Sequence, residues 1–300
     1  MARIHFPECA LSVGGSHFAR IQSASLDIDR PAQVEHYLSA YGPSRPNFIQ
    51  GDEVRLRLEG LVLSQATLGQ FNFADDPDKA AAAPMLNGSY STPSLVLGLD
   101  TKQVTFTSCY LNSYSMTARV RDVVRQSLGF EGNELALSTG GVSNPLTDTS
   151  PVLRHSDVTI TVPQGVGELD SGVSTATVPI QECSVQVSIP WEPQYAIGSL
   201  TPRRRVLSGD ILCSVRFTTM PITLQDYTAP SSWVDANTYT IAITLERGAN
   251  TSLFTIYQAV AVRDSFSVSV SDTAAIITAE YQAYCHGPEA EAGLWISTPE

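Results

Sequence analysis

Motifs of catalysis and nucleotide binding are missing from this 300-residue sequence. It contains no Gly-Xaa-Xaa-Xaa-Xaa-Gly-Lys phosphate loop, no dinucleotide fingerprint, no His-Glu-Xaa-Xaa-His helix and no Gly-Xaa-Ser-Xaa-Gly elbow. Its histidines are scattered singly, so the local sequence places none of them beside a nucleophile or a second ligand. We therefore expect no enzymatic activity and no cofactor. The histidines are His5, His17, His36, His155 and His286.

Metal-binding and disulfide patterns are also absent. The five cysteines are far apart and form no Cys-Xaa-Xaa-Cys pair, so we expect buried free thiols rather than disulfides or a zinc site. Three aspartates at 75–78 resemble the start of a calcium loop, but Pro77 interrupts them and the required glycine and distal glutamate are lacking. Because these carboxylates precede four alanines, they instead predict a short helix within residues 64–92.

Charge is sparse and mostly negative. Charged residues make up only 16% of the chain, so we expect other subunits to cover much of its surface. The net charge of −12 argues against tight binding to phosphate backbones. The one basic cluster, Arg203 to Arg205, is expected to pair with carboxylates of a neighbouring subunit. No apolar run reaches the length of a membrane span and the first residues do not resemble a signal peptide, so we expect a protein made in the cytoplasm without membrane contact.

An internal repeat is the strongest positive feature of the sequence. The pattern of residues 21–31 recurs at residues 180–190, in phase and without a gap. In both copies apolar and polar residues alternate up to a proline. This period of two is typical of a strand with one buried face. Each copy continues through an irregular, proline-broken segment to a second alternating strand, at 54–59 and at 211–217.

A shared hairpin completes the repeat. Residues 111–132 turn near Asp122 and residues 262–287 turn near Asp272, and the first strand of both opens with Ser-aromatic-Ser. Two copies of one mainly β domain are the simplest account.

The repeat predicts domains at 1–145 and 146–300. They are joined by a stretch at 133–156 that is rich in Ser, Thr, Gly and Pro. The acidic tail at 289–300 either docks on a neighbour or frays.

The order of these parts resembles phage tail tube proteins. The first copy occupies residues 21–58 and 111–132. It consists of an alternating Ser-rich strand, a loop with Pro-Xaa-Arg, a second alternating strand, an insertion and a hairpin opened by Leu-Xaa-Ser-Tyr-Ser. Similar parts recur at residues 180–217 and 262–287. The resemblance implies two tandem tail-tube-like β-sandwich or barrel domains, each with a short flanking helix. Members usually carry one domain and stack as hexameric rings, whereas a duplicated form builds a trimeric ring that copies six-fold symmetry.

The resemblance therefore implies a structural virion protein, a major tail tube subunit that polymerises into stacked rings and forms a conduit for DNA ejection. The implied partners are further copies of the chain and other tail proteins, such as a terminator, a baseplate or hub and a sheath, while DNA passes without specific binding. Such a protein is assembled in the host cytoplasm and resides in the virion tail. Two alternatives stay open: a tail hub or terminal ring protein, and a receptor- or carbohydrate-binding β-sandwich of a fibre.

Polar and basic residues of the repeat are the candidates for the lumen of the tube and for the contacts between subunits. If the paired strands form the inner wall of a closed barrel, their polar faces line the channel. The proline-broken segments at 33–50 and 192–208 are rich in Tyr and Arg, and we expect them to reach a neighbouring subunit or the next ring. The lumen-facing candidates are Asp27, Asp29, Glu59 and Glu182, and the inter-subunit candidates are Arg45, Arg203 and Arg204.

Overall fold

Strands dominate the fold. In the computed structural model nearly all regular structure is β-strand, which confirms the predicted mainly β class. The described residues contain one helical turn, the 3-10 turn η2 (His155–Asp157). The short helix expected within residues 64–92 lies outside them. The residues that the structure describes are 9–13, 16–17, 21–29, 32–35, 45–48, 53–61, 95–99, 102–132, 134–139, 152–161, 180–219, 239–247, 250–262, 267–270, 275–285 and 293–297.

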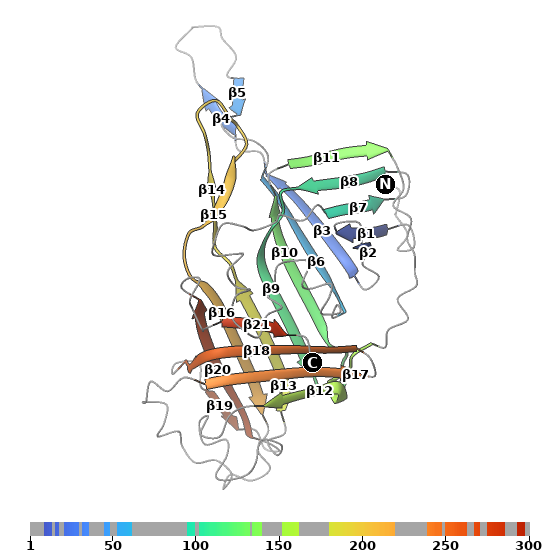
Figure 1. Cartoon of the computed structure of the whole chain (residues 1–300), viewed down its shortest axis with the longest axis vertical. Coiled ribbons are helices and arrows are strands. Elements are labelled where there is room, and N and C mark those ends of the chain that lie inside the picture. Colours follow the sequence, from blue (N-terminus) through green and yellow to red (C-terminus); the bar gives the residue numbers. More distant parts are fainter. Residues whose placement is uncertain are drawn as a thin grey trace.

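A long antiparallel sheet runs through the molecule (Figure 1). Two further strands lie off its main path. These are β19 (Ser267–Val270), which pairs with β20 (Ala275–Cys285), and β21 (Gly293–Ser297), which pairs with β18 (Asn250–Ala261). The main path, in spatial order, is β12 (Val158–Thr161), β17 (Tyr239–Arg247), β18 (Asn250–Ala261), β20 (Ala275–Cys285), β16 (Ile211–Thr219), β13 (Ile180–Ser188), β9 (Tyr110–Arg119), β10 (Arg125–Gly132), β6 (Glu53–Leu61) and β3 (Ile21–Asp29).

Three smaller sheets complete the described structure. Two of them are two-stranded ribbons that project from the same end of the long sheet (Figure 1). They lie within the proline-broken segments after each repeated strand, where a long loop or a ribbon was expected. The ribbons are β4 (Ala32–Glu35) with β5 (Arg45–Phe48), and β14 (Trp191–Gln194) with β15 (Arg204–Leu207); the third sheet has the order β11 (Glu134–Thr139), β8 (Lys102–Thr107), β7 (Leu95–Leu99), β1 (Cys9–Val13) and β2 (Ser16–His17).

The order of strands occurs twice. On the long sheet β3-β6-β10-β9 is followed by β13-β16-β20, and β20 also pairs with β19. Beside these strands the order β1-β7-β8-β11 matches β12-β17-β18-β21. Strand β9 of the first sequence repeat pairs with β13 of the second, so one sheet crosses from one repeat to the other. The predicted domain boundary between residues 145 and 146 lies outside the described residues.

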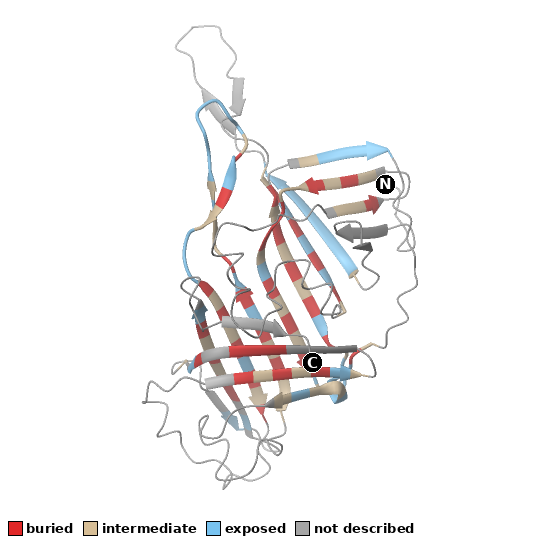
Figure 2. Cartoon of the chain, viewed as in Figure 1, coloured by how far each residue is buried: buried red, intermediate tan, exposed pale blue. Residues whose placement is uncertain are grey.

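Alternation along the strands builds one core. In β6 the buried Val54, Leu56 and Leu58 alternate with exposed Arg55 and Arg57, as the period of two predicts. Buried side chains of both repeats form one continuous cluster, visible as red bands along the strands in Figure 2. Each fully buried leucine of this kind contributes about 1.5–3 kcal/mol relative to an exposed one.

Three expectations need correction. Strand β3 was expected to bury its apolar side chains, yet in the single chain they are exposed because β3 is the last strand of the sheet. The expected join at 133–156 contains a strand, β11, that pairs with β8. The tail is not frayed at residues 293–297, because β21 pairs there with β18 of the same chain, and its docking on a neighbour stays a prediction.

The buried thiols lead to a first testable prediction. Cys109, Cys183 and Cys213 are free and buried, as expected. Burial, and secondarily the charge of Glu182, raises the pKa of the Cys183 thiol to about 12, so hardly any reactive thiolate forms at pH 8. We expect a thiol reagent at pH 8 to modify at most two of the five cysteines quickly in the native protein and all five in urea. Rapid labelling of Cys183 without denaturant, detected by peptide mass spectrometry, would contradict this arrangement.

Candidate functional site

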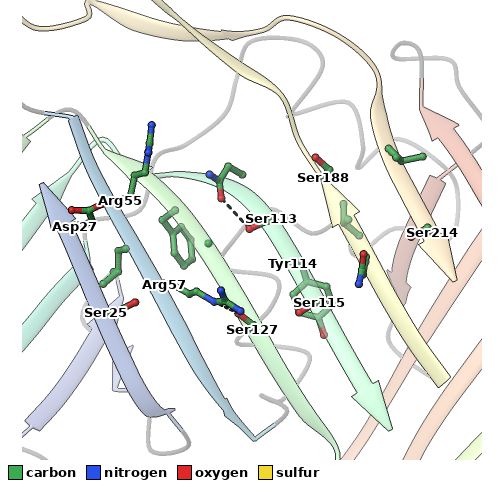
Figure 3. A pocket seen from close by; sticks show the side chains of 17 residues that line it. Ser25, Asp27, Arg55, Arg57, Ser113, Tyr114, Ser115, Ser127, Ser188 and Ser214 are labelled. Carbon is green, nitrogen blue, oxygen red and sulfur yellow. Dashed lines mark hydrogen bonds between the residues drawn. The ribbon is translucent and has the colours of Figure 1, made fainter. Parts of the chain in front are cut away.

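The polar face of the long sheet is the candidate site. Residues directly opposite one another in antiparallel strands share a face, and the register carries one polar surface from β3 to β16. Serine is frequent on it, so we call it the serine face. Figure 3 shows part of this surface. Its members include Ser23, Ser25, Asp27, Asp29, Arg55, Arg57, Glu59, Ser115, Ser127, Glu182, Ser184, Gln186 and Ser214.

A hollow of about 510 Å³ opens on the serine face between β3 and β16 (Figure 3). Inside it, β10 changes its register against β9 between Gly129 and Phe130. A Cβ on Gly129 would collide with the hydroxyl of Ser113 and the amide oxygen of Asn112, which are hydrogen-bonded to each other at 3.1 Å. Glycine therefore lets the two polar side chains of β9 occupy this position.

Charges on the serine face are largely paired. Nε of Arg57 lies 3.1 Å from Oε1 of Glu59, and it also donates a hydrogen bond to Ser127. Nη2 of Arg119 lies 2.7 Å from Oε2 of Glu182 across the junction of β9 and β13. The hydrogen bond and the charge of Glu182 raise the pKa of the Arg119 guanidinium, which stays fully protonated. These pairs leave the face much less negative than its carboxylates alone suggest.

The four lumen candidates share this face. Asp27 lies opposite Arg55 in the register, and Asp29 follows two residues later on the same exposed side of β3. Glu59 and Glu182 are the two carboxylates that arginines neutralise. The structure thus brings the candidates onto one surface, but it divides them into two exposed aspartates and two paired glutamates.

The ribbon β14–β15 is anchored to the first repeat at its base. Nη1 of Arg205 lies 2.5 Å from Oε2 of Glu131 in β10, and the Arg205 side chain is only 4% exposed. Nε1 of Trp191 donates a hydrogen bond of 2.7 Å to the carbonyl of Leu111, and the Trp191 ring meets Tyr110 edge to face at 5.2 Å. Arg205 therefore pairs within the chain, which corrects the expectation that the whole arginine cluster binds a neighbouring subunit.

The inter-subunit candidates lie on the ribbons. Arg203 and Arg204 are exposed, and Nε of Arg204 donates to Gln194 of the paired strand. Tyr195, Ile197 and Leu200 are exposed apolar residues between the two strands of this ribbon. Arg45 lies in β5 at the equivalent place of the other ribbon, and its side chain is outside the described part.

Two strands of the consecutive sets β3-β6-β10-β9 and β13-β16-β20-β19 have an outer edge that carries no partner strand within the described structure. They are β3 and β19. Both present apolar side chains to solvent, namely Leu26 and Ile28 on β3 and Val270 on β19. Such edges are ready to pair with another strand.

Sequence reasoning anticipated open strand edges but not which strands form them, and it missed the ribbon anchor. A signal for the anchor was present, since the two repeats differ there: Trp191 and Arg205 occupy positions that hold Ala32 and Pro46 in the first repeat. A substitution confined to one copy indicates a contact that only that copy makes.

Comparison with known proteins does not show a family for this chain. No protein-family model matches the chain, and no curated protein resembles it to a significant degree. Within the described ranges no three His, Cys, Asp or Glu side chains gather where they could hold a metal ion. Those ranges also include no helix with the length and apolar character needed to cross a membrane.

Proposed function

We propose that this chain is the structural subunit of a viral tail tube, in which copies close into rings and the rings stack into a conduit for DNA. The observation that carries the proposal is the pair of open apolar edges at β3 and β19, which end the two consecutive strand sets β3-β6-β10-β9 and β13-β16-β20-β19. Head-to-tail pairing of such edges continues the sheet from copy to copy, and a closed ring leaves none of them open.

The duplication sets the size of the ring. Each chain contributes two sets of four inner strands, β3-β6-β10-β9 and β13-β16-β20-β19. Three chains therefore supply the six sets that a six-fold tube of this family contains. The two ribbons project from the same end of the sheet and are placed to reach the next ring, together with Arg45, Arg203 and Arg204.

In this ring the serine face lines the channel. Asp27 and Asp29 supply its unpaired negative charges, whereas Glu59 and Glu182 are held by Arg57 and Arg119. DNA then passes over hydroxyl groups and over arginines such as Arg57 and Arg119, whose charges are already paired with Glu59 and Glu182 rather than free to grip its phosphates. In this role the chain needs no enzymatic activity and no cofactor.

Negative-stain electron microscopy of the purified protein tests the proposal. We expect rings and rods with a central channel, because the open edges pair as soon as concentration allows. Compact single particles at every concentration would contradict the tube and would favour the binding β-sandwich of a fibre instead.

A further inference from the structure

The junction inside the chain shows how two repeats join. Strands β9 and β13 pair antiparallel, and their apolar side chains meet on the core side. Val185 lies opposite Met116, and both side chains are fully buried. Cys183 lies opposite Ala118, and these are buried as well. A sheet continues across this junction without a break.

The strand registers give the equivalent positions in the two repeats. In the first repeat Leu26 lies opposite Leu56, and Leu56 lies opposite Phe130. In the second repeat Val185 lies opposite Val215, and Val215 lies opposite Tyr281. Leu26 is therefore equivalent to Val185, as the offset of the sequence repeat also requires.

The same comparison places β19 as the equivalent of β9. Phe130 and Tyr281 are equivalent, so Gln126 and Ile277, four residues earlier, are equivalent too. Gln126 lies opposite Met116, and Ile277 lies opposite Val268. This alignment also makes the Ser-aromatic-Ser motif at 113–115 equivalent to the one at 265–267.

We propose that β3 of one copy pairs antiparallel with β19 of the next copy in the register of the internal junction. Leu26 then lies opposite Val268, Ala24 opposite Val270, and Ser25 opposite Ser269. This inference rests on the proposed self-assembly and names the strands, the register and the partner, a second copy of this chain.

Burial supports the pairing. Leu26 is 36% exposed and Ile28 is 46% exposed, whereas their equivalents Val185 and Val187 are 0% and 4% exposed. Val270 is 72% exposed, whereas its equivalent Ala118 is 6% exposed. The apolar residues that the single chain leaves in water are thus the ones that the internal junction buries.

The two junctions differ in strength. Glu182, which pairs with Arg119 at the internal junction, is replaced by Ser23 in the first repeat. Trp191 and Arg205, which anchor the ribbon across the internal junction, are replaced by Ala32 and Pro46. At these positions the junction between copies lacks the ion pair and the anchor of the internal junction, so we expect rings to separate into intact chains before the chains unfold.

Disulfide cross-linking tests the register. Directly opposite residues of antiparallel strands have Cα atoms about 4.5–5.5 Å apart, within the range of a disulfide, whereas a partner two residues away is beyond it. The variant Ser25→Cys with Ser269→Cys is compared with the slipped pair Ser25→Cys with Ser267→Cys, with both single variants and with the parent protein. After mild oxidation, we expect the first variant to form a ladder of covalent multimers on a non-reducing gel, several-fold stronger than in any control.

Electron microscopy of the same samples separates the two hypotheses. Rods or rings without preferential cross-linking of the first variant would overturn the register and leave the tube intact. A strong ladder from particles that form no ring or rod would support the pairing and overturn the tube. Neither ladder nor assembly would overturn both.

Discussion

We expect the Leu26→Asp variant to lose the proposed association of copies while the single chain stays folded. The side chain is partly in water in the isolated chain, so a carboxylate there keeps its hydration. In the proposed junction the same position is covered by β19 of the next copy, where an unpaired charge costs on the order of 3 kcal/mol or more. That cost lowers the association constant at each junction by roughly a hundredfold or more. Sedimentation velocity measures the association, and circular dichroism reports the fold.

The neighbouring residue supplies a matched control. Ser25 lies in the same strand, but its side chain points to the serine face rather than to the apolar side. The Ser25→Asp variant adds the same charge at the same edge and should still assemble. Rods from Leu26→Asp, or equal loss of assembly in both variants, would contradict the role of the apolar edge.

Replacing Arg205 by alanine has the largest expected effect on the stability of the chain. The variant leaves the carboxylate of Glu131 without its buried cation and removes the arginine stem from the base of the ribbon. Breaking a buried ion pair costs about 3–5 kcal/mol, and because Glu131 is partly exposed we expect a loss of about 2–4 kcal/mol in the free energy of unfolding. Urea denaturation followed by fluorescence measures it.

Arg204 is the control for this effect. It is exposed and donates to Gln194 within the ribbon, so Arg204→Ala should change the free energy of unfolding by no more than about 0.5 kcal/mol. The double variant Arg205→Met with Glu131→Gln should be more stable than Arg205→Ala, because it leaves no uncompensated charge at the base of the ribbon. Equal stability of the Arg205→Ala and Arg204→Ala variants would show that the ribbon is not anchored through this pair.

Much of the sheet could be predicted from the sequence because alternation is a local property. The strands at 21–29, 180–188 and 211–219 each contain a stretch in which apolar and polar residues alternate, and a pleated strand with one apolar side is the simplest structure for each. The turn near Asp122 was also predictable, and Arg121 there has a φ of 68°, a conformation typical of tight turns. Strand β11 was not predictable, because its short sequence lies in a stretch rich in Ser, Thr and Gly.

The burial of a strand could not be predicted in the same way. Ala24, Leu26 and Ile28 have the same pattern as Cys183, Val185 and Val187, yet one set is exposed and the other buried. The difference depends on which strand lies on the far side, and that is a property of the sheet order rather than of the local sequence.

The charge of the candidate site was likewise only half predictable. Alternation placed Glu59 and Glu182 on the polar side of their strands. Their neutralisation depends on Arg57, two residues away in the same strand, and on Arg119 in a strand 63 residues distant in sequence. Pairing of the second kind arises from the register of β9 with β13, which no local pattern specifies.

Cryo-electron microscopy of assembled particles tests the central claim most directly, by counting chains in a ring and tracing the strands at their junctions. The account predicts three chains per ring, β3 of each paired with β19 of the next, and the serine face with Asp27 and Asp29 turned towards the channel. Six chains per ring, or a serine face on the outside of the particle, would contradict it.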